Sequence, residues 1–218
     1  MRATLLLSLI GLTTPLAAFA EDNRHFLFTG DGIAEGEGRV ALGLNALMIG
    51  GGGLDTWGGL PSIDIRYGRG ISGPIDLRLS LDSLGVYNAF DAGAGIALIR
   101  APNFGFGLRA GITGIIVATG DGGGGVFAAT PGAVATLRGD NVALSFGADV
   151  PMFFNGFIVS PSQSNTGAGF VPSVRPNITL EAGSAAGAKF YLRGEATMFF
   201  VEGIDMPILA NIAAGVHF

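Results

Sequence analysis

The sequence predicts an all-β protein: a transmembrane antiparallel up-and-down β-barrel of about ten strands, with eight or twelve strands as alternatives. Three observations predict it. Segments in which apolar and polar residues alternate recur along the chain, which is the period of a β-strand. Charged residues make up only 13% and the mean hydropathy is +0.52, against roughly 25% charged residues in ordinary soluble domains. The longest charge-free stretch beyond residue 20, 150–174, contains three prolines and three glycines and is unsuited to a membrane-spanning helix.

Ten segments are predicted as strands from their alternation and from the glycine, proline and asparagine residues between them. They are 40–49, 62–68, 75–81, 90–99, 104–116, 126–137, 142–153, 170–182, 189–200 and 208–218. The third alternates most clearly, with large apolar residues at the odd positions from Ile75 to Leu81 and polar or charged residues at the even positions between them. The sixth has no assignable facing, because Pro131 and many small residues obscure its pattern.

The connections between these segments differ in length. Those after the even-numbered segments are short turns, whereas 50–60 and 154–169, after the first and seventh segments, are long. Short turns at one end and longer loops at the other are typical of membrane β-barrels. We therefore expect turns at one end and surface loops at the other.

The last segment, 208–218, alternates cleanly and ends on an aromatic residue. It resembles the terminal strand by which bacterial outer-membrane β-barrels are recognised for assembly, and the positions that carry the resemblance are Ile212, Ala214, Val216 and Phe218. The resemblance implies an outer-membrane location, contact with outer-membrane lipid and the barrel-assembly machinery as a partner. It extends to the whole class of small outer-membrane barrels and identifies no specific family, so it implies no functional residues.

The beginning of the chain has the pattern of a secretory signal peptide. Arg2 precedes an apolar run over 5–12, and an Ala-Phe-Ala cleavage site follows. We expect residues 1–20 to be the signal peptide, 21–38 to be a periplasmic N-terminal lead-in and 39–218 to be the barrel. For the acidic, glycine-rich lead-in, an extra strand or a small plug is the alternative.

Charge placement decides which face of the predicted strands meets lipid. Alternation also permits a soluble barrel with its apolar face inside. Twelve charged residues share the polar face, however, and five are arginines, each of which would cost about 2–4 kcal/mol on the lipid side at the bilayer midplane. Lysine, common on soluble surfaces, is nearly absent. The predicted lumen-lining residues are Asp64, Arg66, Asp76, Arg78, Asp82, Asp91, Arg109, Asp149, Arg175, Glu181, Arg193 and Glu195.

Composition also limits the function. A net charge of −5 argues against nucleic-acid binding, and the absence of cysteine excludes disulfides and thiolate chemistry. We expect no metal and no cofactor. We also expect no catalytic residue, because the two histidines, His25 and His217, lie far from the predicted surface loops. The sequence favours a narrow channel for small solutes or ions with a charged lumen. The alternatives are a closed barrel with a structural or adhesin-like role through the loops 50–60 and 154–169, and an outer-membrane enzyme.

Overall fold

The computed structural model describes residues 26–51, 54–120, 122–160, 163–167, 171–184, 187–200 and 208–218. The predicted signal peptide and the first five residues of the predicted lead-in, 21–25, lie outside this part of the chain. Among the described residues, no helix has the length and hydropathy needed to cross a bilayer.

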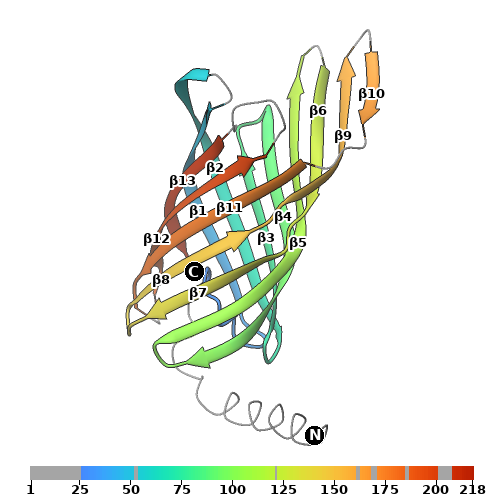
Figure 1. Cartoon of the computed structure of the whole chain (residues 1–218). Coiled ribbons are helices and arrows are strands. Elements are labelled where there is room, and N and C mark those ends of the chain that lie inside the picture. Colours follow the sequence, from blue (N-terminus) through green and yellow to red (C-terminus); the bar gives the residue numbers. More distant parts are fainter. Residues whose placement is uncertain are drawn as a thin grey trace, which may run out of the picture.

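The described residues form thirteen strands joined in one sheet, and every strand pairing is antiparallel (Figure 1). The strands are β1 (Gly38–Gly51), β2 (Leu54–Ser72), β3 (Ile75–Ser83), β4 (Tyr87–Ala101), β5 (Phe104–Thr119), β6 (Gly122–Ala129), β7 (Gly132–Arg138), β8 (Val142–Asp149), β9 (Met152–Ser160), β10 (Gln163–Gly167), β11 (Val171–Ala182), β12 (Lys189–Phe199) and β13 (Ile208–His217). Strands β1 and β2 have 14 and 19 residues, more than the roughly 9–11 residues that cross a bilayer. The wall therefore continues beyond the membrane.

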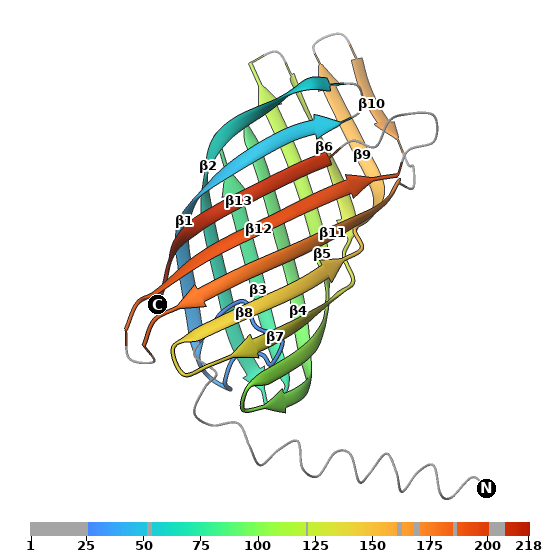
Figure 2. The same ribbon diagram turned by 60° about the vertical axis from the view of Figure 1, so that its left-hand side comes forward.

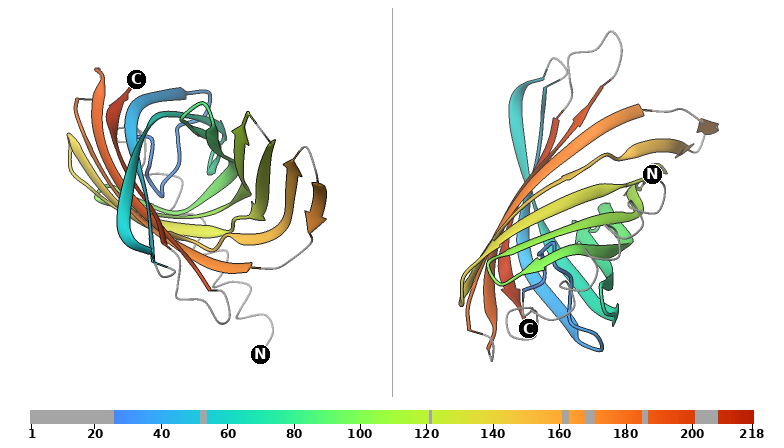
Figure 3. Two further views of the ribbon diagram at one scale, coloured as in Figure 1. Left: turned by 90° about the horizontal axis from the view of Figure 1, so that it is seen from above. Right: turned by 60° about the horizontal axis from the view of Figure 1, so that its bottom comes forward.

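The sheet closes into a barrel because β1 pairs with both β2 and β13 (Figure 3). The β1–β13 register begins with Ala41 opposite His217, and Val40 and Phe218 exchange backbone hydrogen bonds of 2.9 and 3.2 Å at its end. Strands β6 and β7 share one position in the wall, β8 and β9 share the next, and β10 pairs only with β9 among the described strands. The ring thus has about ten positions, and the predicted all-β antiparallel barrel is confirmed.

Two predicted strands, 126–137 and 142–153, are each divided by a proline. Pro131 separates β6 from β7, and Pro151 separates β8 from β9, because proline has no N–H to donate to a ladder. The breaks lie side by side, and the Val150 N–H donates to the Pro131 carbonyl over 2.8 Å. On one side of the breaks β6 pairs with β5 and β9, and on the other β7 pairs with β5 and β8.

The prediction of long loops over 50–60 and 154–169 is wrong for the described residues of these ranges, which lie mostly in strands. Strand β1 continues to Gly51 and β2 begins at Leu54, while β9 extends to Ser160 and forms a hairpin with β10. Glycine, serine and asparagine have low β-propensity, yet the neighbouring strands hold these residues in the ladder. In Figure 1, β6, β9 and β10 extend beyond the ring, since β9 pairs with β11 over two residues only.

The exterior of the barrel is apolar and the interior is polar. Exposed large apolar residues include Leu44, Leu79, Ile112, Leu137, Phe146, Leu180, Phe190 and Ile212. Buried polar residues include Asp64, Asp76, Thr136, Ser145, Arg175, Glu181 and Arg193. This arrangement is the reverse of a soluble protein, in which charged residues are rarely buried, so the alternative of a soluble barrel with an apolar core is wrong. An exterior of this kind requires lipid, and the fold is a transmembrane barrel of the bacterial outer-membrane type.

A row of aromatic side chains follows the exterior wall across four strands. Phe90 on β4 lies 6.2 Å from Phe127 on β6, and Phe127 lies 6.5 Å from Phe157 on β9, measured between ring centroids. Gly114 and Gly125 leave room for the rings, because an added Cβ would lie 2.2 Å from Phe90 and 2.7 Å from Phe157. Aromatic belts mark the interface between lipid and water, so this row indicates where the bilayer ends on that side.

The lipid-facing exterior predicts a depth-dependent cost for charge. Leu77 is exposed on β3 between the aromatic row and the end of the barrel that has the turns, and Leu137 is exposed next to the turn after β7. Leu77→Arg should lower the free energy of unfolding by about 2–4 kcal/mol, whereas Leu137→Arg should lower it by about 0–1 kcal/mol. Urea unfolding in lipid vesicles measures both values. Equal losses at the two positions would contradict the assigned membrane position.

Candidate functional site

A plug formed by residues 26–34 fills one end of the barrel (Figure 2). This is the turn end, where β2–β3, β4–β5, β7–β8 and β11–β12 are connected; the opposite end is called the loop end. Phe26, Leu27, Phe28 and Ile33 are 0–6% exposed. The predicted lead-in therefore enters the lumen from residue 26 onward instead of remaining outside the barrel, which corresponds to the plug alternative.

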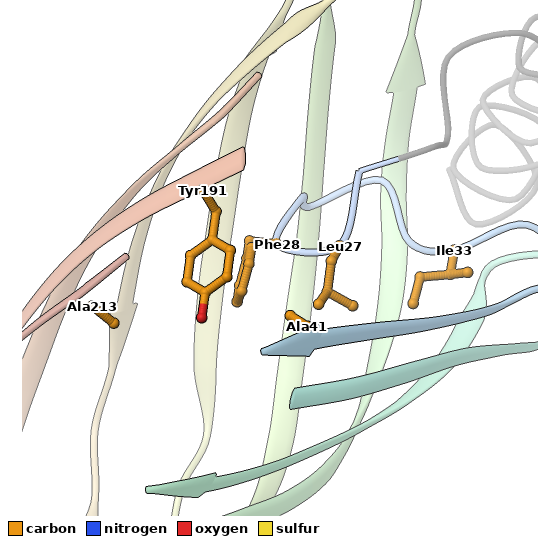
Figure 4. Close-up of a cluster of buried hydrophobic side chains, with 6 residues drawn as sticks. All are labelled: Leu27, Phe28, Ile33, Ala41, Tyr191 and Ala213. Carbon is orange, nitrogen blue, oxygen red and sulfur yellow. The ribbon is translucent and has the colours of Figure 1, made fainter. Parts of the chain in front are cut away.

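The apolar side chains of the plug pack against the inner wall. Figure 4 shows Leu27, Phe28 and Ile33 in one cluster with Ala41 of β1, Tyr191 of β12 and Ala213 of β13. The Phe28 and Tyr191 rings lie 5.1 Å apart. The guanidinium groups of Arg66 and Arg193 are each 5.7 Å from the Phe28 ring centre, a distance at which cation–π attraction operates.

Side chains of the wall bind the backbone of the plug. The Glu181 carboxylate accepts hydrogen bonds from the Leu27 and Phe28 N–H groups over 2.8 and 3.0 Å. Arg78 donates to the Leu27 and Thr29 carbonyls over 3.0 and 2.9 Å. The wall thereby satisfies backbone groups that a segment without secondary structure leaves unpaired.

Two further contacts hold the middle of the plug. The Gly30 N–H donates to the Thr136 hydroxyl over 2.9 Å, and the Arg138 guanidinium forms an ion pair with Asp31. Both partners of this ion pair are buried. Removal of one partner from a buried pair leaves an uncompensated charge, so the pair favours the inserted position of the plug.

Glycines in the wall make the space that the plug occupies. A Cβ at Gly68 would lie 2.4 Å from Ile33 Cδ1 and 2.7 Å from Leu27 Cδ1, and one at Gly107 would lie 2.3 Å from the Gly30 carbonyl oxygen. A side chain at Gly107 would collide with backbone atoms, and one at Gly68 would force the ends of the Ile33 and Leu27 side chains to move. The glycines on the lumen face of β2 and β5 therefore accommodate a folded segment of the same chain.

A cavity of about 670 Å³, including its opening to solvent, lies next to the plug on the loop-end side. Leu27 and Phe28 border it at the plug. The five predicted lumen arginines all line it, together with two of the predicted acids; these residues are Arg66, Arg78, Arg109, Arg175, Arg193, Asp91 and Asp149. The ring brings them together from β2, β3, β4, β5, β8, β11 and β12.

Three of the arginines pair with an acid two residues away on their own strand. Arg66 Nε lies 2.8 Å from Asp64, Arg78 Nε lies 2.8 Å from Asp76, and Arg193 Nη2 lies 2.5 Å from Glu195. Residues i and i+2 of a strand share a face. The sequence predicted that these residues share the inner face, and the structure shows that each of these three arginines binds the acid two residues away.

Other pairs join distant segments. Arg175 of β11 bridges Asp91 of β4 at 3.1 Å and Asp149 of β8 at 3.4 Å. Arg66 also lies 3.7 Å from Asp82 of β3. Local spacing gives no indication of these contacts, because closure of the ring and the strand register create them.

Arg109 differs from the other four cavity arginines. Within the described part of the chain the guanidinium of Arg109 forms no ion pair and no hydrogen bond, whereas each of the other four has a carboxylate within ion-pair distance. Its charged neighbours are Asp149, Arg78, Arg193 and Arg175. Asp149 forms no ion pair with Arg109; it lies 3.4 Å from Arg175 and accepts a hydrogen bond from Asn177 over 3.4 Å. One guanidinium thus enters the cavity without a carboxylate partner.

Several interior residues were missing from the predicted set. Tyr191 donates to Asp64 over 2.5 Å, and His217 Nε2 lies 2.9 Å from Glu181. Both lie on the polar face of their strands, and this facing was the available signal. Arg138 and Asp31 had none, because Arg138 fell in the predicted turn after the sixth strand and Asp31 belongs to the plug.

The predicted assembly positions lie on the exterior of β13. Ile212, Val216 and Phe218 are 50%, 39% and 58% exposed, and Ala214 is half-buried. Their face is thus accessible along the strand that closes the ring with β1. Recognition of these residues by the assembly machinery stays a prediction.

Comparisons with known proteins return only distant likenesses of fold. No protein-family model and no curated protein matches the sequence. The chain is similar to the attachment invasion locus protein Ail of Yersinia pestis (12% identity, TM-score 0.37, covering 85% of this chain and 100% of that one). It is also similar to Neisserial surface protein A (8%, 0.39, 83% and 95%) and to the Pseudomonas putida toluene transporter TodX (9%, 0.35, 92% and 76%). The apolar exterior and the closed ring themselves show that the protein is a membrane-spanning barrel.

The fit of the plug over Gly68 predicts that a side chain there will displace it. The sequence has no cysteine, so Thr29→Cys, at a position 1% exposed in the plug, introduces a single thiol. This thiol should resist labelling by a maleimide in the otherwise wild-type barrel and react rapidly when Gly68→Leu is added. Gly120→Val is the control, because an added Cβ at Gly120 meets nothing within 4 Å. If the thiol stays protected when Gly68→Leu is added, the position of the plug does not depend on the space at Gly68.

Proposed function

We propose that the protein is a narrow outer-membrane channel for small solutes or ions, closed at its turn end by the plug. The observation that carries this proposal is the nature of the closure. The plug is held mainly by side-chain contacts with Glu181, Arg78, Thr136 and Arg138. It is not a strand of the sheet, and the described backbone pairing next to it is an isolated bridge at Glu35. Such a segment can leave without opening the wall.

The lining of the cavity supports passage of polar solutes. Fixed charges of both signs lie along its wall, and charged rings of this kind select ions in channels. A ten-stranded barrel is much narrower than the 16–18 strands of an open porin. The interior is thus suited to small hydrophilic solutes.

A second candidate is a closed barrel that binds partners at the cell surface without catalysis. The hairpin of β9 and β10, together with β6, extends beyond the ring at the loop end (Figure 1). In this function the plug would be a permanent part of the interior. The two candidates differ in whether removal of the plug produces a conducting pore.

Deletion of residues 26–34 tests the channel. The wild-type barrel, refolded into planar bilayers, should give small or infrequent conductance steps, and the deletion should give larger and longer ones, because the plug no longer obstructs the turn end. A different migration of unboiled and boiled protein on gels shows that each barrel is folded. A folded deletion variant without conductance would remove the channel proposal and favour the surface-binding candidate.

A single substitution that keeps the plug tests whether the hydrogen bonds of Glu181 hold the plug in the closed position. Glu181→Gln replaces the carboxylate that accepts the Leu27 and Phe28 N–H groups, and hydrogen bonds to a charged group contribute about 1.5–3 kcal/mol. Openings should become several-fold more frequent at unchanged step size. Glu37→Gln is the matched control, since Glu37 pairs with Arg39 outside the cavity. Equal opening frequencies in the two variants would show that Glu181 does not hold the plug in place.

A further inference from the structure

We propose that the cavity contains a binding site for a small multivalent oxyanion, a phosphoryl or dicarboxylate group, with Arg109 as its central ligand. The site deepens the proposed function, because it names the class of solute that the cavity accepts, and it rests on that proposal for its role in transport. Binding itself requires only the folded barrel and a path for the anion into the cavity.

The first observation is the distribution of partners among the cavity arginines. Four of them have a carboxylate within ion-pair distance, at 2.8 Å for Arg66, 2.8 Å for Arg78, 3.1 Å for Arg175 and 2.5 Å for Arg193. Arg109 has none among the described residues. Arg109 is half-buried in the cavity wall, so its guanidinium is only partly solvated, and a bound anion would supply the counter-charge that it lacks. Arg109 is therefore the place in the cavity where an added anion gains most.

The second observation is that the nearest acid is already occupied. Asp149 accepts from Asn177 over 3.4 Å and lies 3.4 Å from Arg175 Nε. The register places Arg109, Gly132, Asp149 and Arg175 in one row across β5, β7, β8 and β11. Asp149 thus stands between two arginines and forms an ion pair with one of them. The charge of Arg109 remains available to a ligand.

The third observation is the charge around Arg109. Arg78, Arg175 and Arg193 are all near enough to repel it, although each has an acid of its own. An oxyanion with two negative charges would interact favourably with several of these groups together. The planar guanidinium forms paired hydrogen bonds with carboxylate and phosphate oxygens, so its chemistry matches this class of ligand.

The fourth observation is space. Gly93 and Gly111 line the cavity and face it with backbone only. At Gly147, an added Cβ would lie 2.9 Å from Arg109 Nη2 and 2.5 Å from Asn177 Oδ1. Because Gly147 has no side chain, the Arg109 guanidinium can extend along the inner wall from β5 to β8. The cavity that Arg109 lines supplies the volume for a small ligand.

Calorimetric titration of the folded barrel in detergent tests the site, with inorganic phosphate and succinate as probes and chloride at matched ionic strength as the reference. We expect saturable binding of at least one probe, and the probe that binds identifies the group as phosphoryl or dicarboxylate. Arg109→Gln should weaken that binding about tenfold or more, while Arg109→Lys, which keeps the charge but loses the planar fork, should weaken it less. Arg69→Gln, at an exposed position outside the cavity, should leave it unchanged.

The outcomes separate the site from the channel. Absence of saturable binding of both probes, or equal affinity in wild type and Arg109→Gln, would overturn the site even if the barrel conducts. If anion binding depends on Arg109 while the variant lacking 26–34 shows no conductance, the result would support the binding site and contradict the channel proposal. Gel migration of unboiled samples excludes misfolding as the cause of lost binding.

Discussion

Pairing of every backbone N–H and C=O within the hydrocarbon layer is the constraint on which this structure depends. No water is present there to satisfy an open sheet edge, and an unpaired group costs several kcal/mol. The β1–β13 ladder removes the edge. The same closure defines an inside, which becomes the one place where the charged face of each strand can lie. The side-by-side breaks at Pro131 and Pro151 are tolerated because neighbouring strands take over the pairing.

The interior resolves a second problem, the cost of charges removed from bulk water. Acids and arginines lie on the same inner face, and most of the cavity arginines have a carboxylate within ion-pair distance. Arg78 and Glu181 use their remaining capacity to bind the backbone of the plug. The network that neutralises the lumen is therefore also the network that closes it, which links stability of the barrel to the state of the plug.

Glycine has a specific role in this interior. Gly68 and Gly107 leave the space that the plug occupies, and Gly147 leaves the space that the Arg109 and Asn177 side chains occupy on the inner wall. Glycine weakens an isolated strand by about 0.5–1 kcal/mol relative to alanine, and here the loss is offset by contacts that any side chain would block. A lumen-facing glycine in a narrow barrel thus indicates close packing against a folded segment as readily as open space.

Period-two alternation predicted an antiparallel barrel, and the cost of arginine in lipid predicted which face of most strands lies inside it. The sequence by itself also predicted that acids and arginines such as Asp64 and Arg66 share the inner face, but it left open which acid pairs with which arginine. Only the tertiary structure decided that Arg175 meets Asp91, 84 residues away in the chain, that residues 26–34 enter the lumen, and that Arg109 stays without a carboxylate. These contacts depend on ring closure and strand register, which place residues from distant strands side by side and which no local pattern in the chain encodes.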